Sequence, residues 1–270
     1  MGAPGSDRSP DALPGLGGLA VAIVGTAAML GGMVLAGRLG VQLRLGLFLG
    51  ELLLLGPGLL ALAIADLPLA RALRLQPWDR RTMLLAVAAG GAFWVTSYGL
   101  LELQSAVWPP SPDYLERFRR LFEALRPAGP LDWAFSMAAI AVAPAVAEEV
   151  LNRGIILPSF RRPLGDGGAV AASALIFGLM HLDAYRLPFT FMMGLALGAL
   201  RVRTGSLVPG LLAHATVNAL TFTAAPFVDD PAQALPDPRP LLGAAVLLAG
   251  GALSVRLISR FPLTPTRPPA

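Results

Sequence analysis

Residues 144–154 read Pro-Ala-Val-Ala-Glu-Glu-Val-Leu-Asn-Arg-Gly and lie in an apolar run that begins near Ala134. The run contains two adjacent carboxylates, Glu148 and Glu149, and the guanidinium of Arg153. A charged side chain at the centre of a bilayer costs about 2.5–3.5 kcal/mol on insertion scales. Three charges within six positions are therefore expected to pair, to line a polar cavity or to take part in chemistry.

Helical spacing separates the two carboxylates. Glu149 and Arg153 are four residues apart with the acid first, which is the favoured order for an ion pair on one face. Glu148 points about 100° away from that face at 3.6 residues per turn, so it is expected to stay unpaired. Pro144 leaves the carbonyl of Ile140 without its N–H partner, which predicts a kink or a hydrated turn. The alternative role for these charges is an ion pair that only orients two helices.

The composition is that of an integral membrane protein. Hydrophobic residues make up 55% and charged residues 14% of the 270 residues, against about 45–50% and about 25% in soluble domains. The net charge of +4 comes from arginine alone and does not predict a nucleic-acid partner. The chain has no cysteine, which excludes disulfides and thiolate chemistry. Its richness in Ala, Gly, Leu and Arg is typical of a GC-rich bacterial genome, and the expected location is a bacterial plasma membrane.

Apolar runs predict an all-α fold, a polytopic membrane bundle of about eight transmembrane helices. The runs are 16–37, 45–65, 82–106, 132–157, 168–184, 187–202, 206–222 and 240–258. Glu51 and Glu102 lie inside two of them. Glu102 is expected to reach the membrane interface, and Glu51 is expected either to pair across helices or to serve function. More arginines lie on the side that both termini share, which predicts cytoplasmic termini.

Residues 114–126, between the third and fourth runs, have apolar side chains at helical spacing. These side chains are Leu115, Phe118, Leu121, Phe122 and Leu125. The pattern is typical of an amphipathic helix that lies on the membrane surface as an anchor. A part in gating the substrate is the alternative.

Both histidines of the chain lie on the apolar runs that follow Glu148. His181 comes four residues after Phe177, and His214 comes four residues before Asn218, so each pair lies on one helix face. A carboxylate in an apolar setting is a suitable general base, and a histidine beside it can share the proton of a water. His214 and Asn218 can donate hydrogen bonds to the oxyanion that forms when water adds to a carbonyl. These residue types predict hydrolysis of a peptide bond within the membrane.

A metal mechanism remains an alternative. Neither histidine belongs to the H-E-x-x-H motif of zinc proteases. The side chains of suitable type for a nitrogen and oxygen site for zinc are Glu148, Glu149, His181 and His214. The preferred mechanism needs no cofactor.

Three short motifs follow one another on successive apolar runs. They are Glu148-Glu149-x-x-x-Arg153, Phe177-x-x-x-His181 and His214-x-x-x-Asn218. Together they resemble the motifs of the CPBP family of intramembrane proteases, which contains CAAX proteases and bacteriocin-processing proteins and is also called the ABI family. The resemblance covers about residues 131–222 and implies a bundle of about eight helices around a polar cavity.

The resemblance also implies a catalytic set and a supporting set. The catalytic set is Glu148, His181, His214 and Asn218. The supporting set is Glu149, Arg153 and Phe177. In the family, the first glutamate and the following histidine are held to activate water, and the later histidine and asparagine to form the oxyanion hole. Asn152 replaces the aromatic residue that often precedes the family's arginine, which affects local packing but not the catalytic set.

The predicted organisation has four parts. Residues 1–15 are expected to be a disordered lead, 16–130 the N-terminal transmembrane helices with the amphipathic helix, 131–222 the CPBP-like catalytic core, and 223–270 a loop, the last transmembrane helix and a tail.

The predicted function is that of a glutamic-type intramembrane endopeptidase acting on a membrane-associated protein or peptide. The alternative is a non-catalytic membrane scaffold or a bacteriocin self-immunity protein that keeps the motifs as a polar packing network. Some branches of the family trim prenylated C-terminal tails. Others process secreted peptides to their mature form, process membrane-anchoring C-terminal signals, or protect a bacteriocin producer against its own bacteriocin. The motifs do not select among these substrates.

Overall fold

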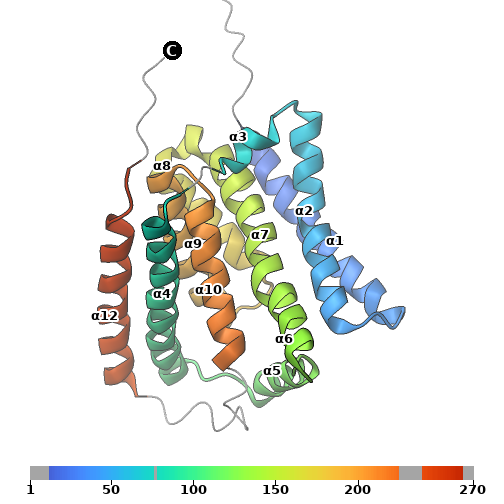
Figure 1. Cartoon of the computed structure of the whole chain (residues 1–270), viewed down its shortest axis with the longest axis vertical. Helices are drawn as coiled ribbons and strands as arrows, with labels where there is room; N and C mark the ends of the chain where they lie inside the picture. Colours follow the sequence, from blue (N-terminus) through green and yellow to red (C-terminus); the bar gives the residue numbers. More distant parts are fainter. Residues whose placement is uncertain (1–11, 76–77, 225–238, 264–270) are drawn as a thin grey trace, which may run out of the picture.

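The computed structural model describes residues 12–75, 78–224 and 239–263, and these residues form a helical bundle (Figure 1). Most of the predicted lead and tail, and the loop before the last helix, lie outside the described residues. The helices are α1 Gly15–Arg38, α2 Leu43–Ile64, α3 Leu69–Leu73, α4 Arg80–Val107, α5 Pro112–Ala124, α6 Pro130–Met137, η1 Ala138–Val142, α7 Ala143–Glu149, η2 Val150–Ile156, α8 Leu157–Met180, α9 Leu187–Thr204, α10 Val208–Ala224 and α12 Pro240–Ser259. The predicted all-α membrane bundle is confirmed.

Five helical segments of the described chain are long and apolar enough to cross a membrane. Four of them are α1, α2, α4 and α12, which match predicted spans. The fifth is the continuous run Pro130–Met180, which joins two predicted spans. Gly165 kinks this run with a φ of 68°, a left-handed conformation that favours glycine. The two remaining predicted spans are the helices α9 and α10, of 18 and 17 residues.

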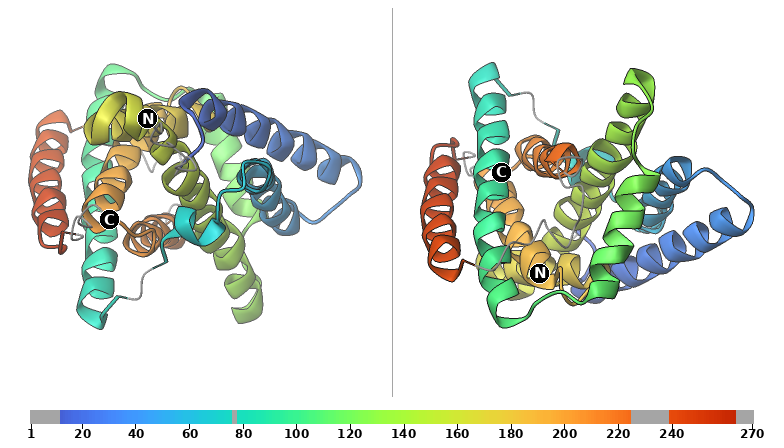
Figure 2. Two further views of the ribbon diagram at one scale, coloured as in Figure 1. Left: turned by 90° about the horizontal axis from the view of Figure 1, so that it is seen from above. Right: turned by 90° about the horizontal axis from the view of Figure 1, so that it is seen from below.

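The motif-bearing helices lie in the middle of the bundle. α4 packs against α12 at one edge, and α1 packs against α2 at the opposite edge (Figure 1 and Figure 2). α7 and α10 contact each other between these edges, and α8 contacts α9. The start of α1 and the end of α12 lie at the same end of the bundle (Figure 1). The outer helices expose many large apolar side chains, such as Leu248 at 73%, as lipid-facing helices do.

Glycines bring α4 and α12 close together. A Cβ at Gly99 would lie 2.5 Å from the backbone of α12, and one at Gly250 would lie 2.7 Å from Oγ1 of Thr96. Membrane helices associate by such close packing, because lipid is as apolar as leucine. Oε2 of Glu102 on α4 also accepts a hydrogen bond from the amide of Arg239 at the start of α12 (2.9 Å). Glu102 is therefore buried and binds this helix end. The expectation that it reaches the interface stays a prediction.

The helix that carries the two carboxylates contains two π-helical segments. η1 precedes α7, and η2 follows it. α7 begins directly after η1, and Pro144 is its second residue. A π-helical turn re-satisfies the backbone groups that a proline leaves without a partner in a membrane helix. The irregularity predicted at Pro144 is therefore present as a widened turn.

α5 lies across the end of the bundle opposite α3 (Figure 1). Oγ of Ser111 accepts a hydrogen bond from the amide of Tyr114 and so caps the first turn (3.2 Å). On its polar face, hydrogen bonds from Arg119 and Arg120 lower the pKa of Glu116 to about 2. The predicted amphipathic helix is therefore present as α5. Its apolar face is suited to the membrane surface, and the same face also covers an internal cavity.

Candidate active site

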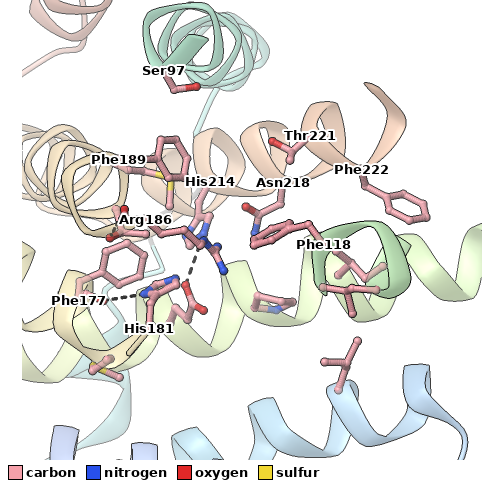
Figure 3. A pocket seen from close by; sticks show the side chains of 18 of the residues that line it. Ser97, Phe118, Phe177, His181, Arg186, Phe189, His214, Asn218, Thr221 and Phe222 are labelled. Carbon is pink, nitrogen blue, oxygen red and sulfur yellow. Dashed lines mark hydrogen bonds and ion pairs between the residues drawn. The ribbon is translucent and has the colours of Figure 1, made fainter. Parts of the chain in front are cut away.

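The three motifs meet at one cavity of about 700 Å³ inside the bundle (Figure 3). The lining is mostly aliphatic and aromatic, and a volume of this size suits a drug-sized ligand or a short peptide segment. All four residues of the predicted catalytic set line it, namely Glu148, His181, His214 and Asn218. They come from α7, the end of α8 and one face of α10.

Glu149 is the centre of a buried network beside this cavity. Its Oε1 accepts a hydrogen bond from Nη1 of Arg153 (2.9 Å) and lies 3.0 Å from Nδ1 of His214. Each of these three side chains is at most 1% exposed. The predicted ion pair between Glu149 and Arg153 is confirmed. His214 is a further partner that lies on another helix and that helical spacing did not predict.

The contact with Glu149 determines which nitrogen of His214 carries a proton. A carboxylate only accepts hydrogen bonds, so we assign the proton to Nδ1. Nε2 then faces Glu148, at 3.6 Å from its Oε2. This separation is too long for a direct hydrogen bond. Neutral His214 therefore presents a lone pair toward Glu148, and protonated His214 presents a donor.

His181 is held in the same tautomer by a different partner. Its Nδ1 lies 2.8 Å from the backbone carbonyl oxygen of Phe177. Because a carbonyl oxygen only accepts hydrogen bonds, Nδ1 must be the donor. Nε2 of the neutral ring is then left as an acceptor. A ring in this state is suited to receive a proton from a water in the cavity.

Phe177 packs against the charged and aromatic groups of the site. The guanidinium carbon of Arg153 lies 4.7 Å from its ring centroid. The rings of His181 and His214 meet the same ring edge-on, with centroids 4.9 Å and 5.9 Å away. Nη2 of Arg153 also donates to the carbonyl oxygen of Gly194 on α9 (3.1 Å). Phe177 and Arg153 thus connect α7, α8, α9 and α10 behind the two histidines.

Comparison with known proteins adds one finding to this geometry. Residues 130–220 match the family model described as Rce1-like, Type II CAAX prenyl endopeptidase. This match supports the resemblance of the segment to the CPBP/CAAX protease family. No curated protein and no solved structure matches the chain. The matched segment runs from α6 into α10 and contains every residue of the catalytic and supporting sets.

The matched segment departs from the family pattern at Asn152, which is fully buried in η2. Its Nδ2 donates to the carbonyl oxygen of Glu148 (3.0 Å), the carbonyl that the amide of residue 152 would occupy in a regular α-helix. Its own carbonyl oxygen accepts from Oγ of Ser173 on α8 (3.2 Å). Asn152 therefore contributes hydrogen bonds to the widened turn, through its side-chain amide and its backbone carbonyl. The family often has an aromatic side chain at this position.

Asn218 and Glu51 are two further polar side chains that line the cavity. Asn218 follows His214 by one turn on α10, and its amide points into the cavity (Figure 3). Glu51 lines the cavity from α2. Its Oε2 is buried and has no hydrogen-bond partner among the described residues. The pairing of Glu51 across helices, one of its two expected roles, is therefore not found in the described part of the chain.

Two aspects of the cavity concern ligands. In the part of the chain that the structure describes, no group of three or more His, Asp or Glu side chains is arranged to hold a metal ion. His214 approaches Glu148 and Glu149 through opposite ring nitrogens, so the three do not converge on one point. Sequence reasoning also missed Arg186, which lines the cavity. A lone arginine in the short turn after the His181 motif was the available signal.

Proposed function

We propose that this chain is an intramembrane endopeptidase that hydrolyses a peptide bond of a membrane-associated protein or peptide. The observation that carries the proposal is that Glu148, His181, His214 and Asn218 converge on one largely apolar cavity. The match to a family of CAAX endopeptidases supports proteolysis as the activity.

In the proposed mechanism Glu148 is the general base. Its carboxylate removes a proton from a water while Nε2 of His181 accepts the second hydrogen bond of that water. The water oxygen bonds to the carbonyl carbon, and the carbonyl oxygen takes up the negative charge. Glu148 then returns the proton to the amide nitrogen as the C–N bond breaks, which regenerates the carboxylate and releases an amine and a carboxylic acid.

His214 and Asn218 are proposed to stabilise the oxyanion. With Nδ1 donating to Glu149, His214 can donate from Nε2 only as an imidazolium. The carboxylate of Glu149 accepts the Nδ1 hydrogen bond and so fixes the ring orientation, as an orienting carboxylate does in a catalytic triad. The side-chain amide of Asn218 supplies the second donor. Both interactions strengthen as charge develops, so they lower the barrier rather than improve substrate binding.

The proposed location is a bacterial plasma membrane, with the bilayer around the outer helices and both termini in the cytoplasm. Reporter fusions at the two termini test this orientation. A periplasmic signal from either end would contradict it.

The Glu148→Gln variant tests the proposed chemistry. It keeps the size and hydrogen bonding of the side chain but removes the base, so cleavage of a co-expressed substrate should fall by about 10²- to 10⁴-fold. The matched control is Glu123→Gln, on the exposed face of α5, which should cleave normally. Full activity of Glu148→Gln would refute the mechanism. An immunity phenotype that survives Glu148→Gln would favour the non-catalytic scaffold.

A further inference from the structure

The proposed mechanism leaves two ionisable groups of the cavity, Glu51 and Arg186, without a task. Arg186 is the sole arginine among the described lining residues. It lies in the turn between His181 and the first residue of α9 and is half-buried. Its side chain extends into the cavity between His214 and Phe118 (Figure 3). It is near enough to Glu148 and His181 to interact with both electrostatically.

No acid of the described residues forms an ion pair with Arg186. The acid nearest in sequence is Asp183, and its Oδ1 already accepts hydrogen bonds from the amides of Tyr185 and Arg186 (3.0 Å and 3.1 Å). The aromatic ring of Phe118 lies 6.0 Å from the guanidinium carbon. A ring face attracts a cation but does not neutralise it. The Arg186 guanidinium is therefore positioned by its surroundings and still available to an anion.

We propose that Arg186 binds a carboxylate of the substrate next to the bond that is cleaved. This inference rests on the proposed peptidase function and specifies the chemistry of its substrate. The carboxylate comes either from the C-terminus of the substrate chain or from an acidic side chain.

The shape of the guanidinium and the character of the cavity favour a carboxylate. A guanidinium is a planar fork that matches two carboxylate oxygens, and such charge-assisted pairs are about twice as strong as neutral hydrogen bonds. The apolar lining strengthens the attraction by reducing the competition from water. Phosphate sites usually gather several donors, whereas Arg186 is alone. Binding at this point would set the distance between the substrate's carboxylate and Glu148, and so would determine which peptide bond is cleaved.

Three fluorescent tripeptides test the proposal by binding to purified protein in detergent micelles. They are dansyl-Leu-Leu-Leu with a free carboxylate, the same peptide as a carboxamide, and dansyl-Leu-Glu-Leu carboxamide. The free acid should bind the unmodified protein about 10- to 100-fold more tightly than its amide. Arg186→Gln should abolish this preference, and Arg186→Lys should keep part of it because the charge remains.

The matched control is Arg117→Gln. The Arg117 guanidinium also lies over an aromatic ring of α5, 5.9 Å from the centroid of Tyr114. Arg117 is exposed and does not line the cavity, so this variant should retain the full preference for the acid. Tight binding of dansyl-Leu-Glu-Leu carboxamide would assign the carboxylate to an acidic side chain, and weak binding would assign it to the C-terminus.

The proposal is overturned if neither peptide with a carboxylate binds more tightly than dansyl-Leu-Leu-Leu carboxamide, or if Arg186→Gln keeps the preference for the carboxylate. Since binding needs no turnover, the same titrations in Glu148→Gln protein test Arg186 independently of the peptidase mechanism. An acid preference that depends on Arg186, found together with an unmodified protein that cleaves no substrate, would support this site and refute the proposed function.

Discussion

The Glu149→Ala variant should lose both stability and activity, and a double variant should separate the two losses. Glu149 and Arg153 are both 0% exposed and joined at 2.9 Å. Alanine would leave the guanidinium buried, with the carbonyl oxygen of Gly194 as its remaining hydrogen-bond acceptor among the described residues. Removing one partner of a buried pair typically costs about 3–5 kcal/mol. The total free energy of unfolding of a typical domain is about 5–15 kcal/mol. Glu149→Ala should therefore remove a large fraction of the free energy of unfolding of this protein.

The double variant Glu149→Leu with Arg153→Met removes both charges and fills most of the volume. Replacing a buried ion pair with apolar residues of similar size is often neutral or stabilising. The coupling energy between the two positions should therefore reach about 3 kcal/mol, the upper end for residues in contact. Cleavage should not recover in the double variant, because Nδ1 of His214 would still lack its acceptor.

Unfolding in mixed micelles with increasing SDS, and cleavage per folded molecule, measure the two effects on the same sample. Glu123→Ala on the exposed face of α5 is the control and should change neither. A stable but inactive Glu149→Ala protein would refute the structural part of the reasoning and would place both acids in the chemistry. A fully active double variant would show that His214 does not need Glu149.

Three further predictions concern the cavity. Asn218→Ala should lower kcat by about 10²- to 10³-fold with little change in KM, because its amide is proposed to bind only the developing oxyanion. Gly210→Ala should lower kcat about tenfold, since its new Cβ would lie 3.1 Å from Oε2 of Glu149 and shift the carboxylate that holds His214. Exhaustive chelation should leave the activity unchanged, and the purified protein should contain far less than stoichiometric zinc.

Each of these three has its own control. A normal kcat in Asn218→Ala, with a stability loss near 0.6 kcal/mol, would indicate a packing role only. The control for Gly210→Ala is Gly91→Ala, whose Cβ would have no atom within 4 Å. Equal activity of these two glycine variants would contradict the role of the Glu149 position. Activity that chelation removes and Zn²⁺ alone restores would favour metal-bound water over carboxylate-activated water.

Features that lie within one helix could be predicted from the sequence. The four-residue spacing of Glu149 and Arg153 predicted their ion pair, and apolar periodicity predicted α5. Contacts between helices could not be predicted, because the depth and rotation of each helix depend on packing that spacing does not describe. Glycine contacts, as at Gly99, set how α12 lies against α4. The packing of α10 against α7 places His214 against Glu149, although the two are 65 residues apart in the chain.

The π-helical segments η1 and η2 also affect how this helix can change in evolution. In a regular α-helix, inserting or deleting one residue rotates everything beyond it by about 100°. Such a change before Glu148 would turn its carboxylate away from the cavity. A π-helical turn differs from an α-helical turn by one residue in its hydrogen-bonding pattern, so a single-residue deletion there can be absorbed by a return to regular α-helix. Homologous chains are therefore expected to differ in length by single residues within 138–142 or 150–156 while keeping both carboxylates in place.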